Sequence, residues 1–192
     1  ESSKEYDIPE LKIMHNFQYA VQILERQSFG RERFVNFISS AILSHLKNDM
    51  YVYHGVAGQF FLRDVGHVLK VRIIADMEER VAAEAERAKL SRDEARRQLR
   101  IDDEERRKWA LLLYGIDIVD PGLYDMVINI SAMSVDNAVD LIIKAVSFPC
   151  FLPTEASVRR IHDLALTAEV RAALFDFPTA GVFVDEGRVH VH

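Results

Sequence analysis

The chain has 192 residues, a net charge of −6 and a hydrophobic fraction of 49%. This length and composition indicate one globular domain, or one domain with a small appendage, with enough apolar material for a core. The negative charge excludes a global basic field that would attract nucleic acid or an anionic membrane, and no apolar run is long enough to span a bilayer.

The first half of the sequence alternates between helical and strand patterns. Apolar residues recur at helical spacing over residues 11–26 and 32–47, which predicts two amphipathic helices. The aromatic and β-branched run 50–54 predicts a short buried strand that ends at Gly55, and the run 68–75 predicts a second strand.

The most charged part of the protein follows the second predicted strand. Asp76 is expected to cap a helix that ends near Lys89, and Ser91 with Glu94 forms a capping-box pattern that begins the next helix. The simplest interpretation of the Glu- and Arg-rich stretch up to about residue 113 is a pair of solvated helices with ion pairs along their surfaces.

The rest of the chain continues the alternation of strands and helices. A loop over 114–122 precedes a predicted strand at 125–130, and Ser134 is expected to cap a helix over 135–146. Strands separated by helices favour parallel strands joined by crossovers. Beyond a boundary at 148–153 we expect a helix over 154–174 and a hairpin whose turn is 185–187.

The cysteine and the histidines indicate neither a disulfide nor a metal site. Cys150 is the sole cysteine, so no internal disulfide can form, which favours a reducing, cytoplasmic location. Because Cys150 lies between Pro149 and Phe151, its thiol is expected to pack as a small apolar group. The seven histidines show no metal-ligand spacing, and only His54, beside the glycine at the strand end, is a candidate for a functional role.

Several segments, taken in order, resemble the cytidylate-kinase-like branch of the nucleotide kinases. They are the strand ending at Gly55, the strand and Glu-Arg helix start at 69–81, the segment 90–107 with its Asp-x-x-Arg element, and the run 114–131. The resemblance covers roughly residues 5–147. It implies a three-layer α/β fold with a parallel sheet, like that of the P-loop nucleotide kinases.

The resemblance also implies roles for particular residues. Arg106 would be the lid arginine that contacts phosphoryl oxygens, with Asp103 as its Asp-x-x-Arg partner, and Arg80 would begin the lid helix and contact the cofactor. His54 and Gly55 would lie at the substrate side of the cleft. For each charged residue the alternative is an ordinary surface charge on a helix.

The phosphate-binding loop of such kinases is missing from the sequence. No Gly-x-x-x-x-Gly-Lys-Ser/Thr occurs, and Val56 stands where the family has an arginine that contacts the acceptor phosphate. We expect the first strand and its loop to lie upstream of Glu1 or to have been lost in this lineage. The chain is therefore expected to bind no cofactor by itself, and ATP with Mg²⁺ would be needed only by an active, longer form.

The C-terminal segment has a different character. Its helix with the sequence Val-Arg-Ala-Ala-Leu, followed by two strands around an acidic-Gly turn, resembles the first half of a BON domain, a small module of bacterial proteins. The alternative is a hairpin that packs on the kinase-like body or pairs with a second chain through an exposed edge.

The sequence therefore predicts a kinase-like domain over 1–147, lacking its first strand, and an α-β-β extension over 154–192. Two functions remain open: a nucleotide-kinase relative that is inactive in this form, and a non-catalytic regulatory or binding module. An unpaired strand edge inside a core is costly, so we also expect a homo-oligomer or a rearranged segment to complete the sheet. A nucleotide is the expected small-molecule partner.

Overall fold

The computed structural model describes residues 30–48, 51–55, 57–177 and 179–192. The predicted helix over 11–26 lies outside these residues. The chain divides into two compact units, which are described separately: unit 1 combines residues up to Val65 with Pro153–His192, and unit 2 is Gly66–Leu152. One junction between the units coincides with the predicted boundary at 148–153, whereas the junction at 65–66 was not predicted.

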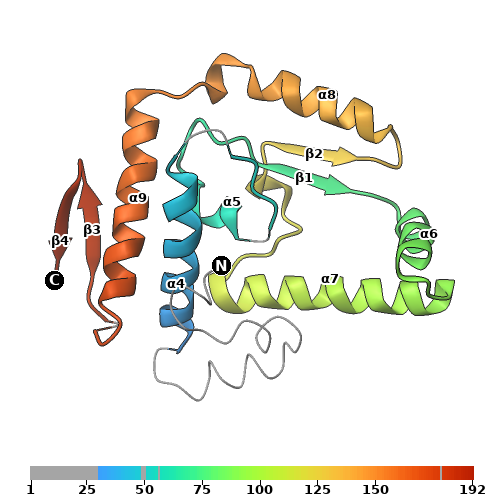
Figure 1. The fold of residues 1–192 in the computed structure, drawn as a ribbon, viewed down its shortest axis with the longest axis horizontal. Coiled ribbons are helices and arrows are strands. Elements are labelled where there is room, and N and C mark those ends of the chain that lie inside the picture. The colour runs from blue at the N-terminus through green and yellow to red at the C-terminus, as the bar shows by residue number, and fades with distance from the viewer. Residues whose placement is uncertain (1–29, 49–50, 56, 178) are drawn as a thin grey trace. The chain divides into compact units, whose positions relative to one another are not determined.

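Unit 1 is built on two long helices that pack along each other, α4 (Gly30–Leu46) and α9 (Glu155–Ala173) (Figure 1). Small residues dominate the buried faces and allow the two backbones to approach closely; these buried residues are Ser39, Ser40, Ala41 and Leu43 on α4 and Ile161, Ala165, Ala168 and Ala172 on α9. Lys47 Nζ, just after α4, donates to Glu169 Oε1 at 2.9 Å. Both predicted helices are confirmed.

A β-hairpin follows α9 in the same unit. Strands β3 (Val182–Asp185) and β4 (Arg188–Val191) are antiparallel, and Val182 and Val184 of β3 are buried on the side that faces α9. The two turn residues have positive φ, 49° at Glu186 and 75° at Gly187, as a two-residue type I′ turn requires. The predicted α-β-β extension is thus confirmed as an arrangement of elements.

The hairpin turn is held to α9 by one carboxylate. Asp163 accepts hydrogen bonds from the backbone N–H groups of Glu186 and Gly187, at 3.0 and 2.8 Å. Charge-assisted bonds of this kind satisfy two donors that a type I′ turn points outward. This contact fixes the end of the hairpin relative to the helix.

Unit 2 contains a parallel strand pair joined by two helices. Strand β1 (Val71–Ile74) pairs with β2 (Met126–Asn129), and the crossover between them consists of α6 (Met77–Ala88) and α7 (Arg92–Tyr114). Helix α8 (Val135–Val146) comes after β2. The mixed α/β class and the parallel crossover are confirmed, but the described residues hold only two parallel strands, so the larger three-layer sheet stays a prediction.

Short elements complete the two units. They are α5 (Gly58–Phe61) and the two 3₁₀ turns η1 (Pro121–Leu123) and η2 (Pro149–Phe151). Among the described residues, no helix combines the length and hydrophobicity that a membrane span would need.

Local capping signals were read correctly at two of three helix starts. Ser91 and Glu94 form the predicted capping box, and the Ser134 side chain accepts a hydrogen bond from the N–H of Asn137. Asp76 does occupy the N-cap position of α6, but its side chain makes no capping hydrogen bond. The acidic residues Glu78 and Glu79 in the first turn still complement the helix dipole.

Two predictions about apolar segments were wrong. Residues 51–54 form no strand and are exposed, because no neighbouring strand pairs with them in the described part of the chain and Tyr53 instead turns its ring back over the following glycines. Cys150 is exposed rather than packed, since η2 carries it on a short surface turn.

Candidate functional site

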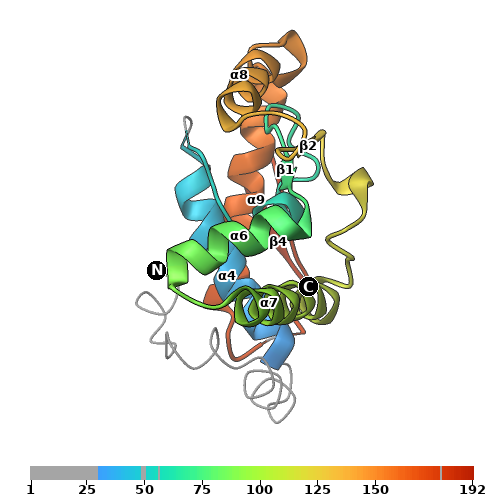
Figure 2. The same ribbon diagram turned by 90° about the vertical axis from the view of Figure 1, so that its right-hand side faces the viewer.

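The helices α6 and α7 form the most charged substructure of unit 2. They cross at a steep angle: Figure 1 shows α7 lengthwise and α6 nearly end-on, and Figure 2 shows the reverse. Val81 of α6 and Ala95 of α7 are fully buried. The crossing therefore has a dry apolar centre, and charged side chains surround it.

A bidentate ion pair joins the two helices. Arg80 Nη1 donates to Asp103 Oδ2 at 2.7 Å, and Arg80 Nη2 donates to Asp103 Oδ1 at 2.8 Å. The fork of the guanidinium matches the two carboxylate oxygens, and these hydrogen bonds raise the pKa of Arg80 above its usual value. Both residues were candidates from the sequence, but the pairing itself was not predicted. It occupies the polar groups that each would otherwise offer to a ligand.

Arg106 differs from its neighbours on α7. It is exposed and makes no hydrogen bond or ion pair within the described part of the chain. By contrast, Arg107 is bound to Asp117 through Nε at 2.9 Å and Nη2 at 2.5 Å, and this contact lowers the pKa of Asp117. Arg106 lies three residues after Asp103, so the ion pair that holds α7 against α6 also places this free guanidinium.

A second ion-pair cluster lies at the same crossing and should make the stability of the fold depend on pH. Glu78 accepts hydrogen bonds from Arg96 at 2.5 and 2.7 Å and from Arg92 at 3.2 Å. The hydrogen bonds with Arg96, followed by those with Arg92, lower the pKa of Glu78 from 4.5 to about 2. A depressed carboxylate pKa stabilises the fold above the unfolded value, so this contribution is lost as the pH falls from about 4.5 through about 2.

We expect a carboxyl NMR titration to show this midpoint directly. Glu78 should titrate near pH 2 in the unmodified chain, and Arg96→Ala should move its pKa toward 4.5 because the principal donor is removed. Arg97→Ala is the matched control, since Arg97 is an exposed arginine on the same helix that does not contact Glu78. A Glu78 midpoint that is the same in both variants would contradict the assignment.

The carboxyl ends of β1 and β2 form a second feature of unit 2. The N–H of Asp76 donates to Ser131 Oγ at 2.7 Å, and the N–H of Ser131 donates to Asn129 Oδ1 at 2.9 Å. The first turns of α6 and α8 begin at this same end of the strands (Figure 1). Ligands of parallel α/β proteins bind at such an edge. This edge was not predicted from the sequence, although polar residues directly after two apolar strands were a usable signal.

The remaining two predicted site residues, His54 and Gly55, belong to unit 1 and not to the unit that holds Arg80, Asp103 and Arg106. His54 is exposed. A Cβ placed on Gly55 or Gly58 would lie closer than 3 Å to the ring of Tyr53, and partial desolvation of this side chain where it covers the glycines raises the pKa of Tyr53. These glycines therefore make room for an aromatic ring and do not form a cradle for a phosphate.

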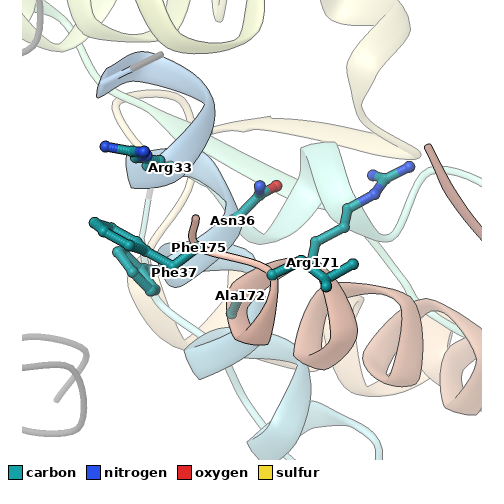
Figure 3. Close-up of a pocket in the computed structure, with 7 residues that line it drawn as sticks. Arg33, Asn36, Phe37, Arg171, Ala172 and Phe175 are labelled. Atoms are coloured by element: carbon teal, nitrogen blue, oxygen red, sulfur yellow. The ribbon is translucent and has the colours of Figure 1, made fainter. Parts of the chain in front are cut away.

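A shallow pocket lies between α4 and the end of α9 (Figure 3). Arg33 stacks over the ring of Phe175 at 4.3 Å, and the rings of Phe175 and Phe37 stack with their centroids 5.4 Å apart. Arg171 donates through Nη2 to the carbonyl of Val182 at 2.9 Å. An adjoining cavity of about 220 Å³ is more open, but Glu32 and Arg171 both line it, so it has no single charge preference. These contacts support packing of α9 against α4.

Among the described residues, neither the crossing of α6 and α7 nor the carboxyl ends of β1 and β2 brings together side chains that could hold a metal ion. Within the described ranges there is no group of three His, Cys, Asp or Glu side chains that could hold a metal ion.

Comparison with known proteins gives one match. A model of the cytidylate kinase-like family matches residues 1–132, more than two thirds of the chain. The matched range includes α6, α7 and all five residues selected from the sequence, and it ends before α8 and the C-terminal hairpin. Searches of curated proteins and of solved structures gave no significant match.

Proposed function

Because the chain belongs to the cytidylate kinase-like family, we propose that it binds a nucleotide through its phosphates but does not by itself transfer a phosphoryl group. One observation carries this proposal. Of the three charged residues expected to act at the lid, Arg80 and Asp103 neutralise each other, and only Arg106 remains exposed and free of partners within the described residues.

The arrangement around Arg106 suits the binding of a phosphate. A guanidinium offers several donors in one plane and stays charged at any physiological pH, so it matches the oxygens of a phosphate group. Arg80 and Asp103 act as positioning residues, because their bidentate contact fixes α7 relative to α6. In this proposal Arg106 contacts the phosphate of a cytidine nucleotide, and the ion pair keeps the helix that carries it in place.

The residues present do not fit a complete site for ATP and Mg²⁺. The sequence holds no Gly-x-x-x-x-Gly-Lys-Ser/Thr motif, and the space above Gly55 and Gly58 is filled by the ring of Tyr53. Phosphoryl transfer depends mainly on positioned amides and cations around the phosphates. This supports the proposal that the chain binds a nucleotide without transferring a phosphoryl group.

Isothermal titration of the 192-residue chain with CMP, CDP and ATP tests the binding. We expect Arg106→Ala to weaken binding of the preferred nucleotide by about 10- to 100-fold, since a hydrogen-bonded charge contributes about 1.5–3 kcal/mol. The matched control is Arg100→Ala, another exposed arginine of α7 without a partner among the described residues, which should change the affinity less than twofold. Equal affinity of both variants would show that Arg106 does not bind phosphate.

A coupled assay for ADP release tests the absence of turnover separately. The chain is incubated with ATP, Mg²⁺ and each nucleoside monophosphate in turn, and no ADP above the ATP-only background is expected. Release of ADP with any acceptor would overturn the inactive assignment, while the binding result with Arg106→Ala would still stand on its own.

The alternative is a non-catalytic module that uses the α-β-β segment for assembly. Strand β4 favours it, because all four of its residues are exposed. Val56 at the place of a phosphate-binding arginine agrees with it as well, although position 56 lies outside the described residues. We also propose the three-layer sheet, the BON-like character of the C-terminal segment and the cytoplasmic location.

A further inference from the structure

We propose that β4 is the interface of a symmetric dimer, in which two copies of the chain join their C-terminal hairpins edge to edge into one four-stranded antiparallel sheet. This surface lies outside the matched family range, and the dimer does not depend on nucleotide binding.

The hydrogen-bond pattern of the hairpin shows which backbone groups are available. Gly181 and His192 exchange both of their backbone hydrogen bonds, at 2.9 and 3.0 Å. Hydrogen-bonded pairs alternate along an antiparallel ladder, so Phe183 with His190 is the next such pair. The N–H and C=O groups of Val189 and Val191 consequently point away from β3, toward the open edge of the sheet.

The side chains at this edge are apolar on one face only. Val189 and Val191 stand opposite Val184 and Val182, which are buried on the side that faces α9. Helix α9 packs against β3, however, and the two β4 valines remain 41% and 55% exposed. Half of the inner face of this sheet is therefore uncovered.

These two observations select one partner and one register. In an antiparallel pair, directly opposite residues point to the same face of the sheet. Val189 must therefore pair with a residue that lies on the inner face of the partner's hairpin. A two-fold axis at His190 places Val189 opposite the partner's Val191, and the reverse. The outward donors and acceptors of both valines then bond each other, and four valines form one continuous apolar row. A second copy of this chain satisfies all of these groups at once.

The competing symmetric register has its axis at Val189. It would place Val191 opposite the partner's Gly187, whose N–H is already bound to Asp163. The His190 register leaves the turn intact and is therefore preferred. The edge also lacks the usual protection against pairing, since β4 contains no proline and no charged residue on its inner face. Four-residue strands bury less than a typical stable interface, so the dimer is expected to be weak and to dissociate on dilution.

The test uses the full chain and one engineered cysteine. In this register the two His190 residues form a non-hydrogen-bonded pair with Cα atoms about 4.5 Å apart, which is suitable for a disulfide. In a Cys150→Ser background, which removes the exposed native thiol, His190→Cys should form a covalent dimer under mild oxidation. Arg188→Cys in the same background is the control, because the two copies of that position lie at opposite ends of the paired strands. Efficient cross-linking at 188 and not at 190 would overturn the register.

A second measurement tests the association without a cross-link. In sedimentation equilibrium the apparent mass should rise from 22.0 kDa toward twice that value with concentration. Val191→Pro removes one outward N–H without touching the β3 ladder, so it should abolish the mass increase while the amides of Phe183 and His190 stay protected from hydrogen exchange. A mass of 22.0 kDa at every concentration, or a Val191→Pro variant that still dimerises with its hairpin intact, would overturn the proposal.

Discussion

Replacing Val81 by aspartate should lower the free energy of unfolding of unit 2 by about 3–5 kcal/mol, because it places an uncompensated charge in a fully buried position. Val81 is the side chain of α6 at the dry centre of the crossing with α7. The substitution should also release the contact between Arg80 and Asp103, since that ion pair forms only while the two helices stay packed.

Urea unfolding measured by the fluorescence of Trp109, the single tryptophan of the chain, gives a direct readout on α7. The matched control is Ala83→Asp, which introduces the same side chain on an exposed position of α6 and should cost less than about 1 kcal/mol. Similar unfolding midpoints for the two variants would show that α6 does not depend on Val81. Weaker binding of nucleotide by Val81→Asp would follow if Arg106 acts as proposed.

Truncating Leu43 to alanine should destabilise unit 1 by about 2–5 kcal/mol. Leu43 is 3% exposed on the face of α4 that packs against α9, and its removal would leave a cavity among small side chains that cannot expand to fill it. Thermal or urea unfolding followed by circular dichroism measures the loss.

Leu141→Ala provides the comparison for Leu43→Ala. Leu141 lies on α8 and is 44% exposed, so the same chemical deletion should cost less than about 1 kcal/mol there. Equal losses at the two positions would mean that α4 and α9 are held together by something other than their buried faces, for instance by the ion pair of Lys47 and Glu169.

The elements predicted correctly are those whose signals lie within the element itself. Ser91 with Glu94 marks a helix start through hydrogen bonds between neighbours in sequence, and Ser134 does the same for α8. The turn at Glu186 and Gly187 is equally local, because the positive φ angles depend on these two residues. Secondary structure of this kind follows from short-range physical chemistry.

The predictions that failed required knowledge of distant neighbours. Residues 51–54 have the composition of a buried strand, but a strand needs another backbone beside it, and Tyr53 found its packing on Gly55 and Gly58. Asp76 has the right residue type and occupies the N-cap position of α6, yet its side chain makes no capping hydrogen bond. Composition alone cannot foresee either outcome.

The candidate site shows the same difference between local signals and contacts that depend on the tertiary structure. The resemblance selected Arg80, Asp103 and Arg106 as individual residues, and the structure does place the first two in contact. Their pairing depends on how two helices cross, which is a tertiary property and has no signature in the Asp-x-x-Arg spacing. The resemblance therefore selected three charged residues, but it could not show that two of them pair with each other.

The division of unit 1 between two chain segments has a consequence for how the protein is made. Helix α4 leaves the ribosome early, but α9 is synthesised only after every residue of unit 2. Domains fold as units during synthesis at about 5–20 residues per second. Unit 2 is contiguous and can complete its contacts first, so the nascent α4 keeps an apolar face without a partner for several seconds, during which a chaperone has its opportunity to bind.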